Sequence, residues 1–239
     1  MNAGDVGFIL ICAALVFFMT PGLACFYGGL VRKKNVVNTM MTSVFIIGTG
    51  IVMWVLFGYS LSFAPTGNGI IGDFRWLGLE GVSVEAGYTE SAAIPNMVFC
   101  AFQMMFAVIT PALITGAIAG RMKFKSVFVF TIVWTLIVYY PLAHMVWAQG
   151  GLLGLEGLGA LDFAGGDVVH ISSGISALVL CILLGKRRDY AHVAYRIHNI
   201  PTVMIGASLL MFGWFGFNAG SALAANGLAA HAFMTTAAS

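Results

Sequence analysis

His170 is the residue best placed to do chemistry, because it lies inside a long apolar run, in GGDVVHISSG. An ionisable side chain at membrane depth is a functional hypothesis by default. Burial disfavours the charged form of histidine, so a buried His170 would be neutral and would offer one N–H donor and one lone pair. That suits a small neutral solute better than a cation. A neutral histidine that only bonds a neighbouring helix is the competing interpretation.

Other ionisable residues near this run have less specific roles. Asp162 and Asp167 flank its start. Asp167 is expected to cap the helix or lie at its N-terminus, where negative charge is favoured. Asp162 could be a cation site or a structural hydrogen-bond acceptor, and the sequence leaves both open. We expect a structural role for His144, and solvated side chains for His192 and His198 in a polar loop.

Two sets of aromatic residues occur at helical spacing. Phe102 and Phe106 are four residues apart and therefore share one face of a helix. A second face, at spacing i, i+3 and i+7, carries Trp214, Phe217 and Ser221. In membrane helices such stripes usually pack or face lipid, so their spacing alone does not indicate a binding site.

These residues must be positioned by membrane-spanning helices. Of the 239 residues, 60% are hydrophobic and 8% charged, and the mean hydropathy is +0.95. Soluble domains carry about 25% charged residues, and spanning strands would alternate apolar and polar residues, which these runs do not. We expect one all-α, polytopic membrane domain over residues 1–239. Its apolar runs cover about residues 6–31, 36–63, 92–119, 127–147, 168–184 and 200–220, and a seventh begins near residue 228.

The charged residues predict the topology. Ten of the eleven Lys and Arg residues follow the first, third and fifth runs, and Arg75 is the exception. Eight of the nine acidic residues lie on or near the other side, Asp189 excepted. Positively charged loops stay in the cytoplasm, so the N-terminus is expected outside the cell. Trp147, at the outer end of the fourth run, would then be an ordinary interface residue.

Small residues and prolines predict local packing. Gly116 with Gly120, and Gly216 with Gly220, have the spacing that lets helix backbones approach closely in lipid. Prolines inside the runs predict kinks that neighbouring helices or water must satisfy. They are Pro21, Pro111 and Pro141.

Several function classes lack a sequence signal. The four cysteines lie inside apolar runs without metal-ligand spacing, so no metal site or cofactor is expected. No phosphate loop, nucleophile triad or paired carboxylates indicate an enzyme. No basic run suits nucleic acid. The Asn-Pro-Ala motifs of water and polyol channels do not occur in this sequence.

Four stretches resemble the ammonium transporter family (Amt/MEP/Rh), in order and spacing, over nearly the whole chain. They are FFMTPGLACFYGGLVRKKNVVNTMM, FQMMFAVITPALITGAIAGRM, AHMVWAQGGLLGLEGLGALDFAGGDVVHISSG and LLMFGWFGFNAGSA. The resemblance implies an eleven-helix bundle built as an inverted repeat. It also implies a homotrimer with one pore per subunit in the cell membrane, and a PII-type regulatory protein as a partner at the cytoplasmic face.

The resemblance also assigns an outer site. Trp147, Phe106 and Ser221 match the residues that recruit ammonium, through cation–π attraction and a hydroxyl acceptor. Asp162 matches a carboxylate that shapes this site without touching the ion.

Deeper residues match the pore. Phe106 and Phe217 correspond to the stacked pair that closes the outer mouth, Trp214 to a ring that lines the pore, and His170 to the first of two pore histidines. A cation at the bilayer centre costs at least about 2.5–3.5 kcal/mol. The expected mechanism is therefore binding of NH4+ outside, loss of its proton, and passage of NH3, with His170 bonding NH3 or relaying the proton.

The match stops before the family's second pore histidine, and His231 is in the wrong place to be that residue. We therefore expect an incomplete pore that exposes His170 and does not conduct alone. The chain would then be a truncated sequence, a piece of a larger protein or a natural half-protein. The alternative function is an ammonium sensor, in which the same membrane domain controls a fused or partner signalling module.

Overall fold

The structure is a computed structural model that describes residues 1–187 and 190–239. Arg188 and Asp189, which entered the charge analysis, lie outside the described residues. Six helical segments are long and apolar enough to cross a membrane. The described chain consists of helices and the loops between them, which confirms the predicted all-α membrane class. Six such segments are the pattern of a multi-pass membrane protein.

Each segment has defined bounds. The first segment is α1 (Ala3–Leu30), and the third is α4 (Asn96–Ile118). The second segment consists of four consecutive elements: η1 (Lys33–Asn35), α2 (Val36–Met53), η2 (Trp54–Gly58) and α3 (Tyr59–Phe63). The fourth segment consists of α5 (Phe124–Trp134), η4 (Thr135–Tyr139) and α6 (Tyr140–Trp147). The fifth consists of η5 (Gly166–Ile171) and α7 (Ser172–Leu184), and the sixth is α8 (Ile200–Gly220). A short turn, η3 (Leu77–Leu79), lies in the loop before α4, and α9 (Gly227–Ala238) follows α8.

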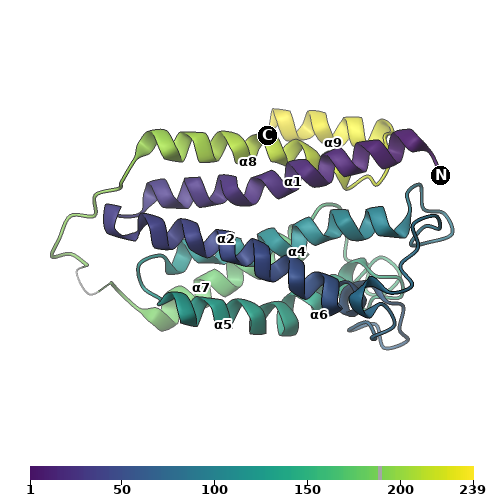
Figure 1. The fold of residues 1–239 in the computed structure, drawn as a ribbon, viewed down its shortest axis with the longest axis horizontal. Coiled ribbons are helices and arrows are strands. Elements are labelled where there is room, and N and C mark those ends of the chain that lie inside the picture. Colours follow the sequence, from purple (N-terminus) through teal and green to yellow (C-terminus); the bar gives the residue numbers. More distant parts are fainter. Residues whose placement is uncertain (188–189) are drawn as a thin grey trace.

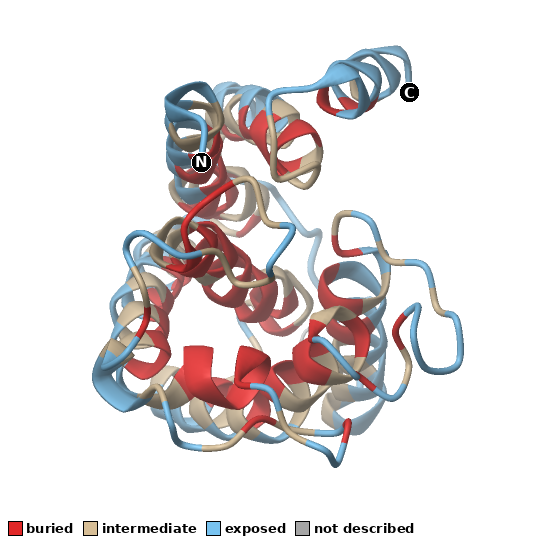
Figure 2. Ribbon diagram, turned by 90° about the vertical axis from the view of Figure 1, so that its right-hand side faces the viewer, coloured by how far each residue is buried: buried red, intermediate tan, exposed pale blue. Residues whose placement is uncertain are grey.

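The segments form one elongated bundle around α4 (Figure 1). α4 is the most deeply buried of the six, and α1, α2 and α7 pack against it. α8 runs along the far side of α1, and α9 packs on α8. Figure 2 shows that buried residues face the inside of the bundle, whereas exposed residues lie on its outer surface and on α9. α4 is therefore the element against which the other site-bearing helices are placed.

Glycines bring α1 and α8 into close contact. A Cβ atom on Gly206 would lie 2.3 Å from the backbone nitrogen of Phe26, and one on Gly216 would lie 2.7 Å from Cβ of Leu15. A Cβ atom on Gly220 would lie 2.7 Å from Cβ of Cys12. The prediction that the small residues of this helix allow close approach is confirmed, since larger side chains would push the two backbones apart.

For the second pair, the prediction holds for Gly116 and was wrong for Gly120. Gly116 faces the ring of Tyr27, to which an added Cβ would approach within 2.5 Å. Gly120 is not on the helix at all, because α4 ends at Ile118 and Gly120 has a φ of +71° in the following turn. Glycine is suited to that backbone conformation because it has no Cβ. Gly120 therefore serves the turn, and only Gly116 serves helix packing.

Three spanning segments contain wide π-type turns that apolar periodicity did not predict. They are η2, η4 and η5. Pro141 lies two residues after the end of η4, in the first turn of α6, whereas Pro21 and Pro111 lie inside α1 and α4. Proline has no N–H to donate, so the wide turn at η4 occurs where the regular hydrogen-bond ladder is interrupted. Such turns are common at functional sites, and η5 contains His170.

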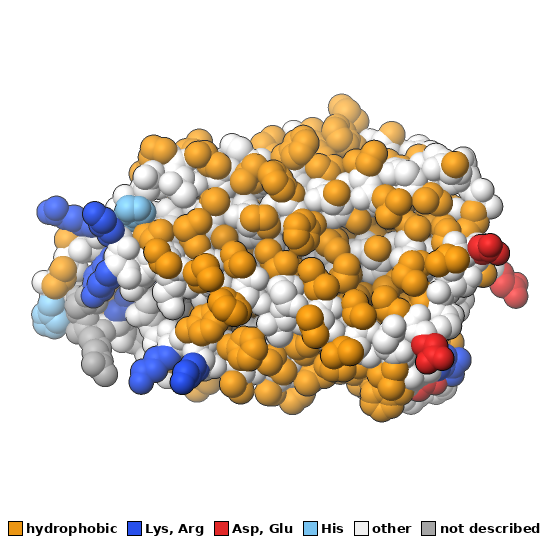
Figure 3. Space-filling view, in the orientation of Figure 1, with side chains coloured by type: hydrophobic (Ala, Val, Ile, Leu, Met, Phe, Trp, Pro, Cys, Tyr) orange, Lys and Arg blue, Asp and Glu red, His pale blue; other side chains and the backbone are white. Residues whose placement is uncertain are grey.

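Charge divides between the two ends of the bundle (Figure 3). The basic end carries the loops around residues 31–35, 119–123, 185–187 and 190–199, and the acidic end carries residues 64–95 and 148–165. Arg75, the cation at the acidic end, forms an ion pair in which its Nη2 lies 2.7 Å from Oδ2 of Asp73. Hydrogen bonds from Arg75 lower the pKa of the Asp73 carboxyl. The local carboxylate therefore accounts for the exception to the charge pattern.

Candidate functional site

Three helices bring aromatic rings together towards the acidic end. Phe106 of α4 is only 1% exposed. Its ring centroid lies 4.4 Å from that of Phe217 on α8, and 5.9 Å from that of Trp147, which meets it edge-on at 86°. Phe102, one turn away on α4, lies 4.9 Å from Phe106 and is equally buried. Rings from different helices, 41 to 115 positions apart in the sequence, thus form one cluster.

A second group of rings continues from Phe217. The imidazole of His170 stacks on the indole of Trp214, with centroids 5.5 Å apart and planes 8° apart. Phe217 lies 5.9 Å from both rings. The rings predicted to form the gate and the pore therefore make a continuous series: Trp147, Phe106, Phe217, and then Trp214 with His170.

His170 itself is exposed. The reason is that α7 packs on α4 along one side only, and its other side, from Ile171 to Leu183, has no helix over it within the described chain. The exposure agrees with the expectation that the helices of this chain leave the histidine uncovered. Further helices or a bilayer would cover the exposed part of this ring.

Asp162 is a structural hydrogen-bond acceptor in this chain. Its Oδ1 accepts from the backbone N–H groups of Gly165 and Gly166, and its Oδ2 accepts from those of Asp167 and Val168, at 2.8–2.9 Å for the last three. A carboxylate has about four lone-pair sites, so all of them are used. These N–H groups begin the segment that carries His170, where negative charge is favoured.

Asp162 thus caps this segment, and Asp167 lies in its first turn, which is the second of the two positions that the sequence analysis gave for Asp167. The side chain of Asp167 lies beside the first turn, whereas Asp162 reaches it from the loop before. The signal that could have found this contact is the run of small residues from Ala164 to Gly166, because a chain without large side chains can wrap around one carboxylate. Of the two open interpretations of Asp162, the acceptor is the one that this geometry favours.

Two hydrogen bonds determine which groups of Trp147 and Ser221 are available to a ligand. Nε1 of Trp147 donates to the backbone oxygen of Asp162 at 3.1 Å, so the indole N–H is satisfied. Oγ of Ser221, at the C-terminal end of α8, donates to the backbone oxygen of Phe217 at 2.8 Å. Ser221 then has only lone pairs to offer. A π face and a hydroxyl acceptor are groups that attract a small cation with N–H donors.

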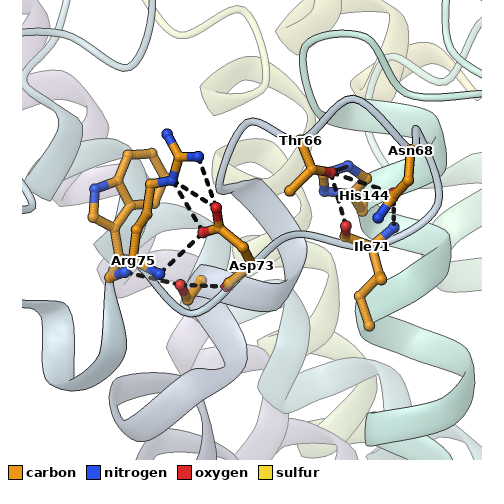
Figure 4. A network of polar contacts seen from close by, with 8 residues as sticks. Thr66, Asn68, Ile71, Asp73, Arg75 and His144 are labelled. Carbon is orange, nitrogen blue, oxygen red and sulfur yellow. Dashed lines mark hydrogen bonds and ion pairs between the residues drawn. The ribbon is translucent and has the colours of Figure 1, made fainter.

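His144 supports the loop at the acidic end (Figure 4). Its ring is fully buried, with Nδ1 3.2 Å from the backbone oxygen of Ser62 and Nε2 3.2 Å from Oγ1 of Thr66. Oγ1 of Thr66 also lies 2.8 Å from the backbone oxygen of Ile71. The structural role expected of His144 is confirmed. The three remaining histidines are exposed: His192, His198 and His231.

Tyr88 is a supporting residue that the sequence analysis missed. Its ring stacks on Phe99 of α4 at 4.9 Å and 10°, and its hydroxyl donates to the backbone oxygen of Phe63 at 3.0 Å. The same hydroxyl accepts from the backbone N–H of Gln149, two residues after Trp147. Burial raises the pKa of Tyr88 to about 12. Tyr88 therefore fastens the long loop to α4 and to the segment that follows Trp147.

Metal chemistry has no structural support in the described residues. In that part of the chain, no three His, Cys, Asp or Glu side chains are close enough to hold a metal ion. The four cysteines are unpaired, and the two most buried of them, Cys12 and Cys100, lie in apolar packing.

Comparison with known proteins gives the family. The sequence model described as "Ammonium Transporter Family" matches residues 7–239. The chain therefore belongs to the ammonium transporter family. An ammonium transporter of Bacillus subtilis is 52% identical over 236 residues, which are 99% of this chain and 57% of that protein. The chain thus spans little more than half the length of this member of the family.

Solved structures place the chain in the same fold. Mep2 of Saccharomyces cerevisiae superposes with a TM-score of 0.88 and 36% identity, over 98% of this chain and 52% of Mep2. A structure titled "Sensor Amt Protein" superposes with a TM-score of 0.79 and 28% identity, over 95% of this chain and 56% of the chain in that structure. The predicted ammonium transporter fold is confirmed. Relatives named as transporters agree with the expectation that the chain is not an enzyme.

Proposed function

We propose that this chain supplies the outer recruitment site and the first part of the pore of an ammonium transporter. The observation that carries the proposal is the unbroken series of rings from Trp147, through Phe106 and Phe217, to the stacked pair of Trp214 and His170. Family membership supports ammonium as the substrate. The roles of the individual residues rest on their geometry.

Recruitment of NH4+ takes place at Trp147, Phe106 and Ser221. Each aromatic face contributes about 0.5–1 kcal/mol of cation–π attraction in water and about 2 kcal/mol where water is excluded. Ser221 accepts a hydrogen bond from the ion, since its own proton is directed to Phe217. Asp162 acts indirectly: its carboxylate holds the first turn of η5, and its backbone oxygen orients Trp147.

NH4+ passes its proton to water at the outer mouth, or towards His170, before the nitrogen passes the stacked phenylalanines as NH3. Phe106 and Phe217 are in van der Waals contact and offer the ion no replacement for its hydration shell. An uncompensated charge deep in a bilayer costs at least about 2.5–3.5 kcal/mol, and the lone pairs of Asp162 are already used. NH3 moves on as a neutral solute. His170 then gives or accepts one hydrogen bond, or relays the proton.

The test is His170→Ala in the full-length protein, reconstituted in liposomes, with His192→Ala as the matched control. His192 is an exposed histidine of the basic-end loop. We expect the alanine at position 170 to abolish the ammonium-driven current or to change its selectivity, and the control to keep both. An unchanged current and selectivity in the first variant would remove His170 from the mechanism.

An ammonium sensor is the second candidate, because the similarity to the structure titled "Sensor Amt Protein" covers 95% of this chain. In that function the outer site binds ammonium and the membrane domain controls a signalling module. Two measurements separate the candidates. An intact mass from the source membrane shows whether a further module is attached, and liposome currents show whether ammonium is conducted. Ammonium binding without current supports the sensor.

The assembly and location proposed for the full-length protein follow the family resemblance. We infer a homotrimer in the cell membrane, with the acidic end outside, the basic end in the cytoplasm, and a PII-type protein as a partner there. The charge distribution supports this orientation. Single cysteines placed at Glu85 and at Lys33 test it. An impermeant thiol reagent added to intact cells should label the first and spare the second, and the opposite pattern reverses the orientation.

A further inference from the structure

The turn between α8 and α9 is tied to the first turn of α1 by a hydrogen bond. Oδ1 of Asp5 accepts from the backbone N–H of Ala225 at 2.7 Å, across 220 positions of the sequence. The two segments lie side by side at the acidic end of the bundle (Figure 1). This turn, residues 221–226, begins with Ser221, the hydroxyl of the proposed recruitment site. A helix that contributes no ring to the aromatic series therefore holds the segment that begins with this hydroxyl.

The end of α1 is capped by Asn2 rather than by Asp5. Oδ1 of Asn2 accepts from the backbone N–H of Gly4 at 2.9 Å. Asp5 lies in the first turn, where the helix dipole favours a negative charge, and this general effect does not require Ala225. The bond from Ala225 adds a directional constraint, because a hydrogen bond weakens steeply when its donor turns away from the acceptor. Asp5 therefore fixes the position of a segment outside its own helix.

The backbone of this turn adopts a conformation that side chains disfavour. Leu223 has a φ of +55°, in the left-handed region, which is uncommon for a residue other than glycine, asparagine or aspartate. Such a conformation persists only where the surrounding structure holds it. The side chain of Leu223 packs against the core, and the bond from Ala225 to Asp5 follows two residues later. Loss of that bond would allow the turn to relax.

Ser221 lies between two contacts with α1. On one side is Gly220, where an added Cβ would lie 2.7 Å from Cβ of Cys12. On the other side is Ala225, bonded to α1 through its N–H. The N–H of Ser221 itself donates to the backbone oxygen of Asn218 over 3.3 Å, which is long for such a bond. The end of α8 therefore depends on α1, at both contacts, for the position of the Ser221 hydroxyl.

We propose that Asp5 is a positioning residue for ammonium recruitment: by holding Ala225, it fixes the direction in which Ser221 presents its lone pairs. The inference rests on the proposed function, in which Ser221 accepts a hydrogen bond from NH4+. A carboxylate at this end of the bundle also attracts cations by its charge alone. The two effects separate in Asp5→Asn, because an amide oxygen still accepts a hydrogen bond from Ala225 but carries no charge.

The test measures ammonium-driven currents of the full-length protein in liposomes, and it yields the half-saturating ammonium concentration and the maximal current. The variants are Asp5→Asn, Asp5→Ala, Ser221→Ala, and Asp5→Ala combined with Ser221→Ala. The matched control is Glu90→Ala, which removes an exposed carboxylate from the same end of the bundle. The double variant distinguishes positioning from a general loss of stability, because a general loss would add to the effect of Ser221→Ala.

We expect Ser221→Ala to raise the half-saturating concentration about tenfold, the effect of losing one hydrogen bond to a charged group. Asp5→Ala should raise it about threefold to tenfold, with the maximal current changed less than about twofold. Asp5→Asn and Glu90→Ala should stay within about twofold of the parent protein. The double variant should match Ser221→Ala alone, because without the hydroxyl there is no acceptor left to position.

Three results would overturn the positioning role alone: effects that multiply in the double variant, an equal rise in Asp5→Asn and Asp5→Ala, or a rise in Ser221→Ala without one in Asp5→Ala. The first would show that Asp5 acts independently of Ser221, and the second would assign its effect to charge. An unchanged half-saturating concentration in Ser221→Ala would remove Ser221 from the proposed recruitment site, and the role of Asp5 with it.

Discussion

Asp162 gives the sharpest test of how the site is built. All four lone-pair sites of its carboxylate accept backbone N–H groups. In Asp162→Asn the amide NH2 cannot accept, so two of the four bonds are lost. In Asp162→Ala all four are lost. A hydrogen bond to a charged group contributes about 1.5–3 kcal/mol. With the lower figure, because the site is only half-buried, the losses are about 3 kcal/mol and about 6 kcal/mol.

Thermal unfolding of the full-length protein in detergent measures these losses. A change of 1 kcal/mol shifts Tm by about 2–4 °C in domains of 150–250 residues. We therefore expect the Asn variant to melt at least about 5 °C lower than the parent protein, and the Ala variant lower still. Asp167→Asn is the control, five residues further on, because its side chain does not hold this turn. Its Tm should change by less than about 2 °C.

Ammonium affinity, measured on the same proteins, separates the two roles of Asp162. If the carboxylate shapes the site, affinity and Tm fall together, and both fall further in Ala than in Asn. If the carboxylate binds the ion, affinity is lost in the Asn variant while Tm stays near the parent value. The second pattern would refute the conclusion that the four backbone N–H groups use this side chain.

Three further predictions follow from packing and titration. Gly206→Ala places a Cβ 2.3 Å from a backbone atom of α1 and should lower the free energy of unfolding by about 1–3 kcal/mol, measured by denaturant unfolding. The control Gly48→Ala meets nothing within 4 Å, so in the same assay it should be neutral or slightly stabilising. Burial raises the folded-state pKa of Tyr88 to about 12. The contribution of its neutral hydroxyl to the stability of the fold is therefore intact below pH 10 and is lost as pH rises from 10 to 12. Tyr88→Phe should melt with a weaker pH dependence in that window, and an identical dependence contradicts this origin. Arg75→Gln should leave the stability measured in the same assay nearly unchanged, because its ion pair with Asp73 is solvent-exposed, and a clear loss of stability would show that the pair supports the loop.

The sequence alone determined the class of the protein. Membrane spans depend on the hydropathy of contiguous residues, and the segregation of charge depends on which loops carry Lys and Arg, so both can be read along the chain. Long stretches around Phe26, Phe106, His170 and Phe217 were sufficient to indicate the ammonium transporter family. Gly216 and Gly220 were correctly predicted as packing residues, because close approach depends on small size at a fixed helical spacing.

Only the tertiary structure decided how these residues act together. The contact of Phe106 with Trp147 and Phe217 joins three helices, and no local pattern fixes their relative rotation. Asp162 remained ambiguous in the sequence, because its four partners are backbone groups, which every residue but proline has. Gly120 was misassigned because helix ends depend on backbone conformation rather than composition. The exposure of His170 depends on which helices cover α7, which is a property of the assembled bundle and not of the run that contains it.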